Sequence, residues 1–172
     1  MRRLFSPRLL SLTALLFAID YAASPFLSPL GGRVDLLYLV ILDYAFFLSW
    51  ELVPFFAVAV GLTRDFLGGH LFGIETAALA VTGILLYFGV KKLERENAWV
   101  RAVISFLFVL LSETLSITLG GWLEAPGVFS GDWVASLLLT TIYTTAFSPV
   151  FFWFTNLWFR RMPALKQYEL FR

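Results

Sequence analysis

The stretch "TRDFLGGHLFGIE", Thr63–Glu75, separates two apolar runs and decides how the chain folds. It contains an arginine, an aspartate, a glutamate and the only histidine of the sequence. Gly68 and Gly69 end the apolar run before them, and the next apolar run starts at Leu71. Because glycines in this position end one helix and allow the next to begin close by, the stretch predicts the turn of a helical hairpin.

The composition indicates that both helices of this hairpin lie in a membrane. Of the 172 residues, 59% are hydrophobic and 15% are charged, whereas about 25% of the residues of an ordinary soluble domain are charged. A soluble domain of this size would leave much of that apolar surface in water. The apolar segments instead approach the ~20 residues that cross the hydrocarbon of a bilayer. We therefore expect one integral membrane domain over residues 1–172.

The fold class that we predict is all-α, a polytopic membrane protein with six transmembrane helices. Pro54 falls in the first turn of its helix, where a missing N–H costs little. Asn97 is a suitable N-cap, and Pro149 is expected to kink the last helix. The predicted helices lie at about residues 9–23, 34–50, 51–67, 71–90, 98–119 and 132–159.

The distribution of lysine and arginine predicts that both termini lie in the cytoplasm, because basic loops resist translocation. An alternative for the N-terminus is a cleaved signal peptide, formed by the apolar run Leu9–Ile19 and the small residues of "YAAS". Cleavage would leave five helices with the C-terminus still inside. Six spans place eleven of the 13 basic residues on one side: Arg2, Arg3, Arg8, Lys91, Lys92, Arg95, Arg101, Arg160, Arg161, Lys166 and Arg172.

Six ionisable residues fall in the outer half of the membrane when depth is counted at ~1.5 Å per helical residue. Charged side chains are costly in hydrocarbon, so this grouping predicts a polar cavity or a partner-docking surface that opens outward. Asp43, near mid-depth, and Glu51, at the inner boundary, do not follow the pattern. The alternative is structural: the arginine neutralises an acid, and the others are protonated or reach headgroups and water. The six residues are Asp20, Asp35, Arg64, Asp65, Glu75 and Glu113.

Small and hydroxylated residues predict close packing between helices. On the last helix, threonines four residues apart predict a hydroxyl stripe that faces a neighbouring helix; they are Thr140, Thr141, Thr144 and Thr145. Glycines let membrane helices approach closely, and five of them lie in or beside the hairpin: Gly61, Gly68, Gly69, Gly73 and Gly83.

The sequence gives no indication of an enzyme. It lacks the HExxH, GxSxG and GxxxxGK[ST] motifs. No motif therefore places a nucleophile at a catalytic spacing from the carboxylates. The absence of cysteine excludes disulfides, iron–sulfur centres and thiol catalysis. His70 is more typical of a solvated or interfacial residue than of a metal ligand. We predict no catalytic, cofactor or metal site, and a net charge of +1 without a basic patch predicts no nucleic-acid partner.

Between Gly32 and Glu113 the chain resembles the MreD family of rod shape-determining membrane proteins. The resemblance rests on "GRVDLLYLVILDY", "GLTRDFLGG" and "HLFGIETAALAVTGILLYFGVKKL". Arg64 and Glu75 are not residues that the family requires, so their roles do not follow from the resemblance. The shared motif is Gly61-x-x-x-Asp65-x-x-Gly68, followed by Gly73 and a small-residue helix with Gly83 and Tyr87.

This resemblance implies a non-enzymatic scaffold of the bacterial cell-elongation machinery, which sets rod shape and organises peptidoglycan synthesis. The implied partners are an MreC-like single-span membrane protein and, indirectly, the MreB filament, RodA and its transpeptidase partner. The implied location is the bacterial cytoplasmic (inner) membrane. The family is in turn similar to the S components of energy-coupling-factor transporters. The alternative function is therefore a small-solute-binding, S-component-like subunit of a membrane transporter.

Overall fold

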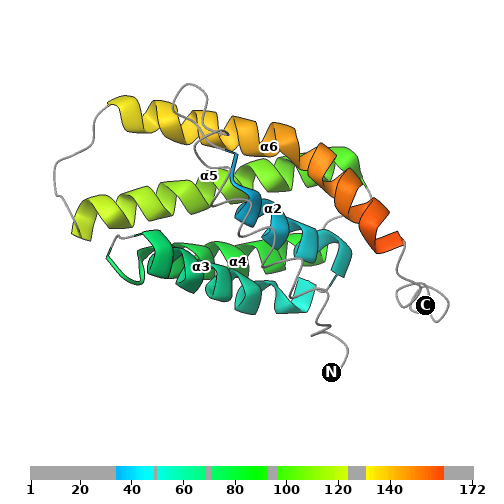
Figure 1. The fold of residues 1–172 in the computed structure, drawn as a ribbon, viewed down its shortest axis with the longest axis horizontal. Helices are drawn as coiled ribbons and strands as arrows, with labels where there is room; N and C mark the ends of the chain where they lie inside the picture. Colours follow the sequence, from blue (N-terminus) through cyan, green and yellow to red (C-terminus); the bar gives the residue numbers. More distant parts are fainter. Residues whose placement is uncertain (1–33, 49, 69–70, 93–96, 124–130, 161–172) are drawn as a thin grey trace.

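The computed structural model describes residues 34–48, 50–68, 71–92, 97–123 and 131–160, and all regular elements within these ranges are helical. Five α-helices follow one another along this part of the chain (Figure 1). The predicted all-α fold is therefore confirmed for the described residues, and the predicted helix at 9–23 lies outside them. The helices are α2 (Leu36–Asp43), α3 (Val53–Gly68), α4 (Ile74–Lys92), α5 (Ala98–Leu123) and α6 (Gly131–Arg160).

Three of these helices contain segments that are long and apolar enough to cross a membrane. The segments are Ile74–Lys91, Ala98–Leu123 and Trp133–Thr155. In contrast, α3 has 16 residues and α2 has 8, fewer than the ~20 that a helix along the membrane normal needs. The three long helices support a membrane protein, and the total of six spans stays a prediction.

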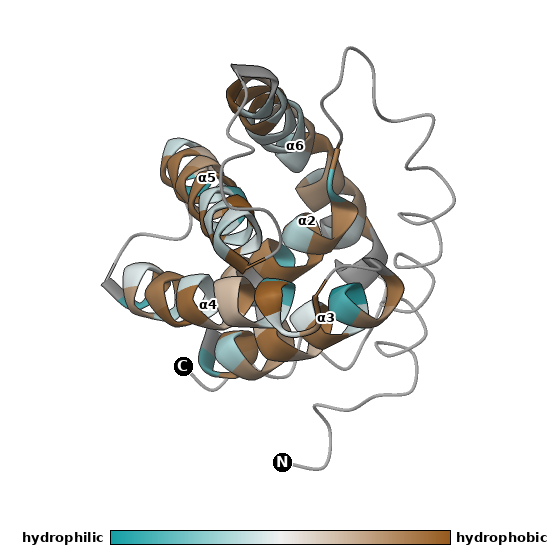
Figure 2. Cartoon of the chain, turned by 90° about the vertical axis from the view of Figure 1, so that its left-hand side faces the viewer, coloured by the Kyte–Doolittle hydropathy of each residue, from teal (hydrophilic) through white to brown (hydrophobic). Residues whose placement is uncertain are grey.

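The short helix α2 occupies the centre of the bundle. All of its residues are buried, and it contacts α3, α5 and α6. Figure 2 shows it lying between these helices. A helix that is apolar all round packs in an interior, and the ring of Tyr38 accordingly meets Phe108 of α5 edge-on at a centroid distance of 5.9 Å. Packing around α2 thus forms the core of the described bundle.

The predicted helix at 34–50 is not a continuous α-helix. Its α-helical part ends at Asp43, and a π-helical turn, Tyr44–Leu48, leads to a short 3-10 turn before α3. The wider turn lets adjacent side chains reach different helices. Asp43 accepts a 2.8 Å hydrogen bond from Thr155 of α6. The ring of Tyr44, the next residue, stacks on that of Phe56 of α3 at a centroid distance of 4.1 Å. The mostly apolar sequence of this segment carries no signal of this change.

The helices α3 and α4 form the antiparallel hairpin that the stretch Thr63–Glu75 predicts (Figure 1). Gly73 stands immediately before α4 with a φ of 103°, a conformation that glycine adopts without a steric penalty. A residue in this conformation cannot continue a right-handed helix. For this reason α4 starts at Ile74 and not near residue 71, as the sequence predicts.

Close contact between α3 and α4 depends on two glycines. A Cβ atom at Gly61 would lie 2.6 Å from the Cα of Thr76, and one at Gly83 would lie 2.6 Å from the Cβ of Ala57. Neither separation is possible without moving a helix. The two helices therefore approach to backbone contact, as small residues allow in membrane proteins.

The long helix α6 changes direction in its second half, drawn in orange in Figure 1, where Pro149 lies inside the helix. Proline has no N–H for the carbonyl four residues earlier, and its ring crowds that carbonyl. The carbonyl concerned belongs to Thr145, and it accepts a 2.8 Å hydrogen bond from the Ser148 hydroxyl. The side chain thus replaces the donor that the proline lacks.

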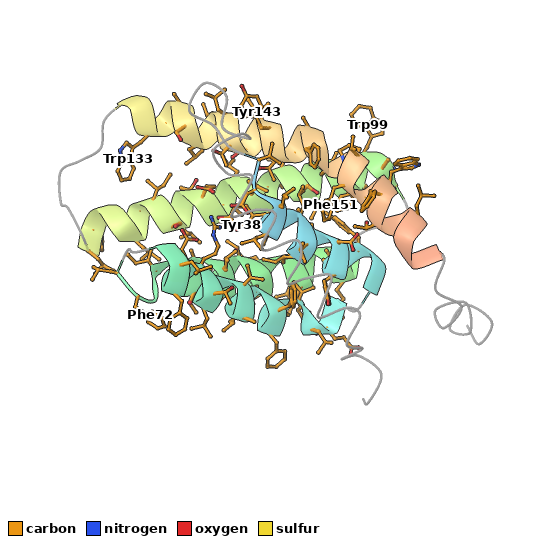
Figure 3. All side chains as sticks on the ribbon, in the orientation of Figure 1. Tyr38, Phe72, Trp99, Trp133, Tyr143 and Phe151 are labelled. Atoms are coloured by element: carbon orange, nitrogen blue, oxygen red, sulfur yellow. The ribbon has the colours of Figure 1, made fainter. Side chains whose placement is uncertain are left out.

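Large apolar side chains cover the outer faces of α3 to α6. Trp99 and Phe55 are 81% and 76% exposed, and Figure 2 shows hydrophobic residues on outward faces of the helices. In Figure 3, Trp99 and Phe72 lie at opposite ends of the bundle periphery, whereas Tyr38 lies in the interior. Apolar surface of this extent is favourable in lipid and costly in water, which agrees with the span-length helices.

Candidate functional site

Arg64 lies near the end of α3 and points into the bundle, toward the start of α2. Its Nη2 is 2.9 Å from Oδ2 of Asp35, and its Nη1 is 3.5 Å from Oε2 of Glu75. The guanidinium carbon lies 4.8 Å from the ring centroid of Tyr38, a cation–π geometry. The Arg64 side chain is only 11% exposed, so these contacts largely replace its solvation.

Asp35 connects three helices. One of its carboxylate oxygens caps α2 by accepting hydrogen bonds from the backbone N–H groups of Leu37 and Tyr38, at 3.1 and 3.3 Å. The other oxygen binds Arg64 of α3. The backbone N–H of Asp35 itself donates to Thr144 Oγ1 of α6 at 3.1 Å. The start of α2 is therefore held against both α3 and α6.

Glu75 makes the corresponding connection to α5. It lies in the first turn of α4, and its Oε1 accepts a 2.6 Å hydrogen bond from Ser116 Oγ, while its Oε2 faces Arg64. Glu113 lies one turn before Ser116 on the same face of α5, near the same guanidinium. We call the set Asp35, Tyr38, Arg64, Glu75, Glu113, Ser116 and Thr144 the polar cluster.

The polar cluster places one guanidinium opposite two carboxyl groups, with side-chain exposure of 1% for Asp35 and 19% for Glu75. Burial of such charges costs several kcal/mol per ion unless partners and hydrogen bonds compensate. Arg64 is the shared counter-charge, and it brings together residues of α2, α3, α4 and α5. The arrangement can therefore position helices relative to one another.

Asp65 adjoins Arg64 in sequence but has a different role. Its carboxylate accepts hydrogen bonds from the backbone N–H groups of Glu75 and Thr76, at 3.0 and 3.1 Å, and from the Thr76 hydroxyl. These N–H groups belong to the first turn of α4, and N–H groups in a first turn have no acceptor within their own helix. Asp65 thus caps α4 from α3 and closes the hairpin turn.

Removal of this cap should destabilise the hairpin. We expect Asp65→Ala to lower the free energy of unfolding by about 1–2 kcal/mol, the usual cost of losing a side-chain cap. Glu51→Ala, which removes an exposed carboxylate before the other end of α3, is the matched control and should change stability by less than about 0.5 kcal/mol. Denaturation of the purified protein in detergent micelles, followed by circular dichroism, measures both. Equal effects of the two substitutions would exclude the capping role.

Two further polar contacts lie deeper in the bundle. Ser112 of α5 donates a 3.0 Å hydrogen bond to Thr82 of α4, and Thr155 of α6 donates to Asp43 of α2. All four residues are buried. Such hydrogen bonds between membrane helices each add on the order of 1 kcal/mol or less, so they supplement the packing of the helices.

The structure brings together four of the six ionisable residues singled out in the sequence: Asp35, Arg64, Glu75 and Glu113. Asp65 lies in the adjacent turn, and Asp20 lies outside the described residues. Of the glycines, Gly61 and Gly83 lie at the helix contact, Gly73 forms the turn, Gly68 ends α3, and Gly69 lies outside the described residues. A docking role for these residues stays a prediction.

Sequence reasoning did not identify Tyr38, Ser116 or Thr76 as members of this region. Tyr38 is one turn after Asp35, and Ser116 is one turn after Glu113, so helical periodicity places each on the same face as an acidic residue. Those spacings are the signals that could have found them. The predicted hydroxyl stripe of α6 does face the interior, since Thr140, Thr141 and Thr144 are buried.

The chemistry of the polar cluster is ionic pairing and hydrogen bonding. Among the residues that the structure describes, no group of three or more His, Cys, Asp or Glu side chains is arranged to hold a metal ion. Comparison of the chain with protein-family models, with curated proteins and with solved structures found no significant match.

Proposed function

We propose that this chain is a non-catalytic scaffold of the bacterial cell-elongation machinery that binds an MreC-like single-span partner. It would reside in the cytoplasmic membrane with six spans and both termini in the cytoplasm. The resemblance of residues 32–113 to MreD proteins supplies the identity of the machinery. The MreB filament, RodA and its transpeptidase partner would be reached through that single-span partner.

The observation that carries this proposal is the division of polar and apolar groups at the turn end of the α3–α4 hairpin. The charged side chains there, Arg64 and Glu75, turn inward and bind residues of the bundle. Groups engaged in this way fit a framework that fixes helix positions better than a pocket that exchanges solutes. Outward from the same turn project four large apolar residues, which we call the hairpin-tip surface: Phe66, Leu67, Leu71 and Phe72.

The hairpin-tip surface has the chemistry of a helix-docking site. Phe66 and Phe72 are 75% and 60% exposed, and their rings pack edge-to-face at 4.9 Å. Aromatic residues that present a rigid apolar area are typical anchors of protein interfaces. The apolar transmembrane segment of a single-span protein is a complementary partner. The polar cluster would hold the hairpin in position, and the hairpin-tip surface would contact the transmembrane segment of the partner.

The test is co-purification of the full chain with its MreC-like partner from detergent-solubilised membranes. Phe66→Ala/Phe72→Ala should reduce the partner recovered by at least about tenfold, since hot-spot aromatic residues each contribute upward of ~2 kcal/mol. Phe55→Ala/Phe88→Ala is the matched control, because these phenylalanines lie on α3 and α4 away from the turn and are 76% and 54% exposed. The control variant should retain the partner.

Two results would contradict the proposal. One is equal recovery of the partner with both double variants, which would remove the hairpin-tip surface from the interface. The other is a stoichiometric, vitamin-like small molecule bound to the purified protein and displaced by changes in the polar cluster. That outcome would favour the S-component-like transport subunit.

A further inference from the structure

A groove lies between α5 and α6 at the end of the bundle opposite the hairpin turn. It has a volume of about 250 Å³. Ala98, Arg101 and Ala102 of α5 form one wall, and Pro149, Phe152 and Trp153 of α6 form part of the other. We infer that this groove binds an anionic phospholipid, with the lipid phosphate at Arg101 and an acyl chain along the apolar wall. The inference requires a membrane location and does not depend on the scaffold proposal.

A proline in α6 and two alanines in α5, all outside the α3–α4 hairpin, shape the groove. Pro149 turns the second half of α6, and the Ser148 hydroxyl satisfies the Thr145 carbonyl that the proline leaves without a donor. On the facing helix, Ala98 and Ala102 are one turn apart and present only methyl groups. A kink opposite two small side chains leaves an open space between helices that are otherwise packed together.

Arg101 is the charged residue among those that line the groove. Arg101 is half-buried in the first turns of α5, where its aliphatic stem can lie along apolar surface while its guanidinium stays near the headgroup region. A guanidinium presents a planar set of donors that matches phosphate oxygens in a bidentate manner. Basic pockets between transmembrane helices are a recurrent means of binding acidic lipid headgroups. A lipid phosphodiester is therefore the complementary group.

The aromatic residues place this groove at the membrane interface. Trp99, beside Ala98, and Trp153, in the groove wall, are 81% and 66% exposed. Tryptophan is enriched at the level of the headgroups, where its ring meets acyl chains and its N–H meets polar groups. With Arg101 at the same end of α5, the phosphate would lie at the level of these rings. The acyl chain would then extend along the apolar wall that includes Phe152 and Pro149.

The experiment uses the full chain reconstituted in nanodiscs of phosphatidylcholine and phosphatidylglycerol at a four-to-one ratio, followed by gentle extraction and native mass spectrometry. The wild-type protein should retain phosphatidylglycerol in preference to phosphatidylcholine. Arg101→Gln should lower that preference by about fivefold. Ala102→Leu, which fills the groove without changing charge, should lower retention of both lipids. Lys91→Gln, at an exposed cation of α4 near the same end, should leave the preference unchanged.

Several outcomes would overturn the inference. The first is an equal loss of preference in Lys91→Gln, which would indicate general surface charge and no site. The second is unchanged lipid retention in both groove variants while each remains folded by circular dichroism. The third is loss of a single-span protein partner from Ala102→Leu with lipid retention intact, which would make the groove a protein interface. Free phosphate that displaces phosphatidylglycerol completely would show that the acyl chain contributes nothing.

Discussion

Arg64→Leu is expected to lower the free energy of unfolding by about 3–5 kcal/mol, because it leaves buried carboxylates without their counter-charge. Asp35 and Glu75 both face the guanidinium that the substitution removes, and leucine offers no donor to either. Arg64→Lys should show an intermediate loss, since one ammonium group cannot reproduce the forked geometry. Reversible unfolding in mixed micelles, followed by tryptophan fluorescence, measures both variants.

The matched control for this prediction is Lys91→Leu, which removes an exposed cation from α4. Exposed ion pairs contribute about 0–1 kcal/mol, so the control should change stability little. A loss in Arg64→Leu no greater than that in the control would mean that the polar cluster does not hold the helices together.

Gly61→Ala is expected to destabilise the protein by about 1–3 kcal/mol through overpacking of the α3–α4 contact. The added methyl group would lie 2.6 Å from the backbone of Thr76, which cannot move without shifting α4. At Gly89, on α4, an added Cβ meets no atom within 4 Å. Gly89→Ala should therefore stabilise the helix by about 0.5–1 kcal/mol, the usual advantage of alanine over glycine.

The opposite signs of the two glycine substitutions make this test specific. Both add the same methyl group to a helical glycine of the hairpin, so helix propensity predicts stabilisation in both cases. Only backbone contact between α3 and α4 predicts a loss at Gly61. Thermal unfolding of the two variants under the same conditions gives the comparison, and stabilisation by both would show that the helices do not touch there.

Several features of the fold follow from sequence alone because their causes are local. Glycines and charges at the stretch Thr63–Glu75 predict a hairpin turn, and the structure has one. Helix boundaries near Pro54 and Asn97 are set by a missing N–H and by a capping side chain; Asn97 accepts from the backbone N–H of Trp99 at 3.0 Å. The positive φ of Gly73 is also a local effect, and it accounts for the later start of α4.

Other features of the fold do not follow from sequence because they depend on which helices meet. Asp35 and Thr144 are 109 residues apart, and Asp43 and Thr155 are 112 apart. Periodicity assigns no partner across such separations, and it does not show the π-helical turn after Asp43, since the residues of that turn are mostly apolar.

For Arg64 and Asp65, the sequence predicts that the two charges lie at the same end of the bundle, but it does not predict their different roles. The sequence groups both with the acids of one end, which agrees with their positions in the structure. Neighbouring residues on a helix point in directions about 100° apart, so the arginine enters the bundle while the aspartate reaches the start of α4. Composition and depth predict that the charges lie together. Only the packing of the helices shows that Arg64 forms ion pairs and that Asp65 caps α4.

Arg64 joins α3 to α2 through its ion pair with Asp35, and a double-mutant cycle measures the strength of this link. Unfolding free energies of Arg64→Gln, Asp35→Asn and the combined variant should show a coupling energy of at least about 1 kcal/mol. The matched cycle of Arg64→Gln with Asp43→Asn should be additive within about 0.5 kcal/mol, because Asp43 bonds to Thr155. Additivity in the first cycle, or equal coupling in both, would show that the ion pair between Arg64 and Asp35 does not hold α3 against α2.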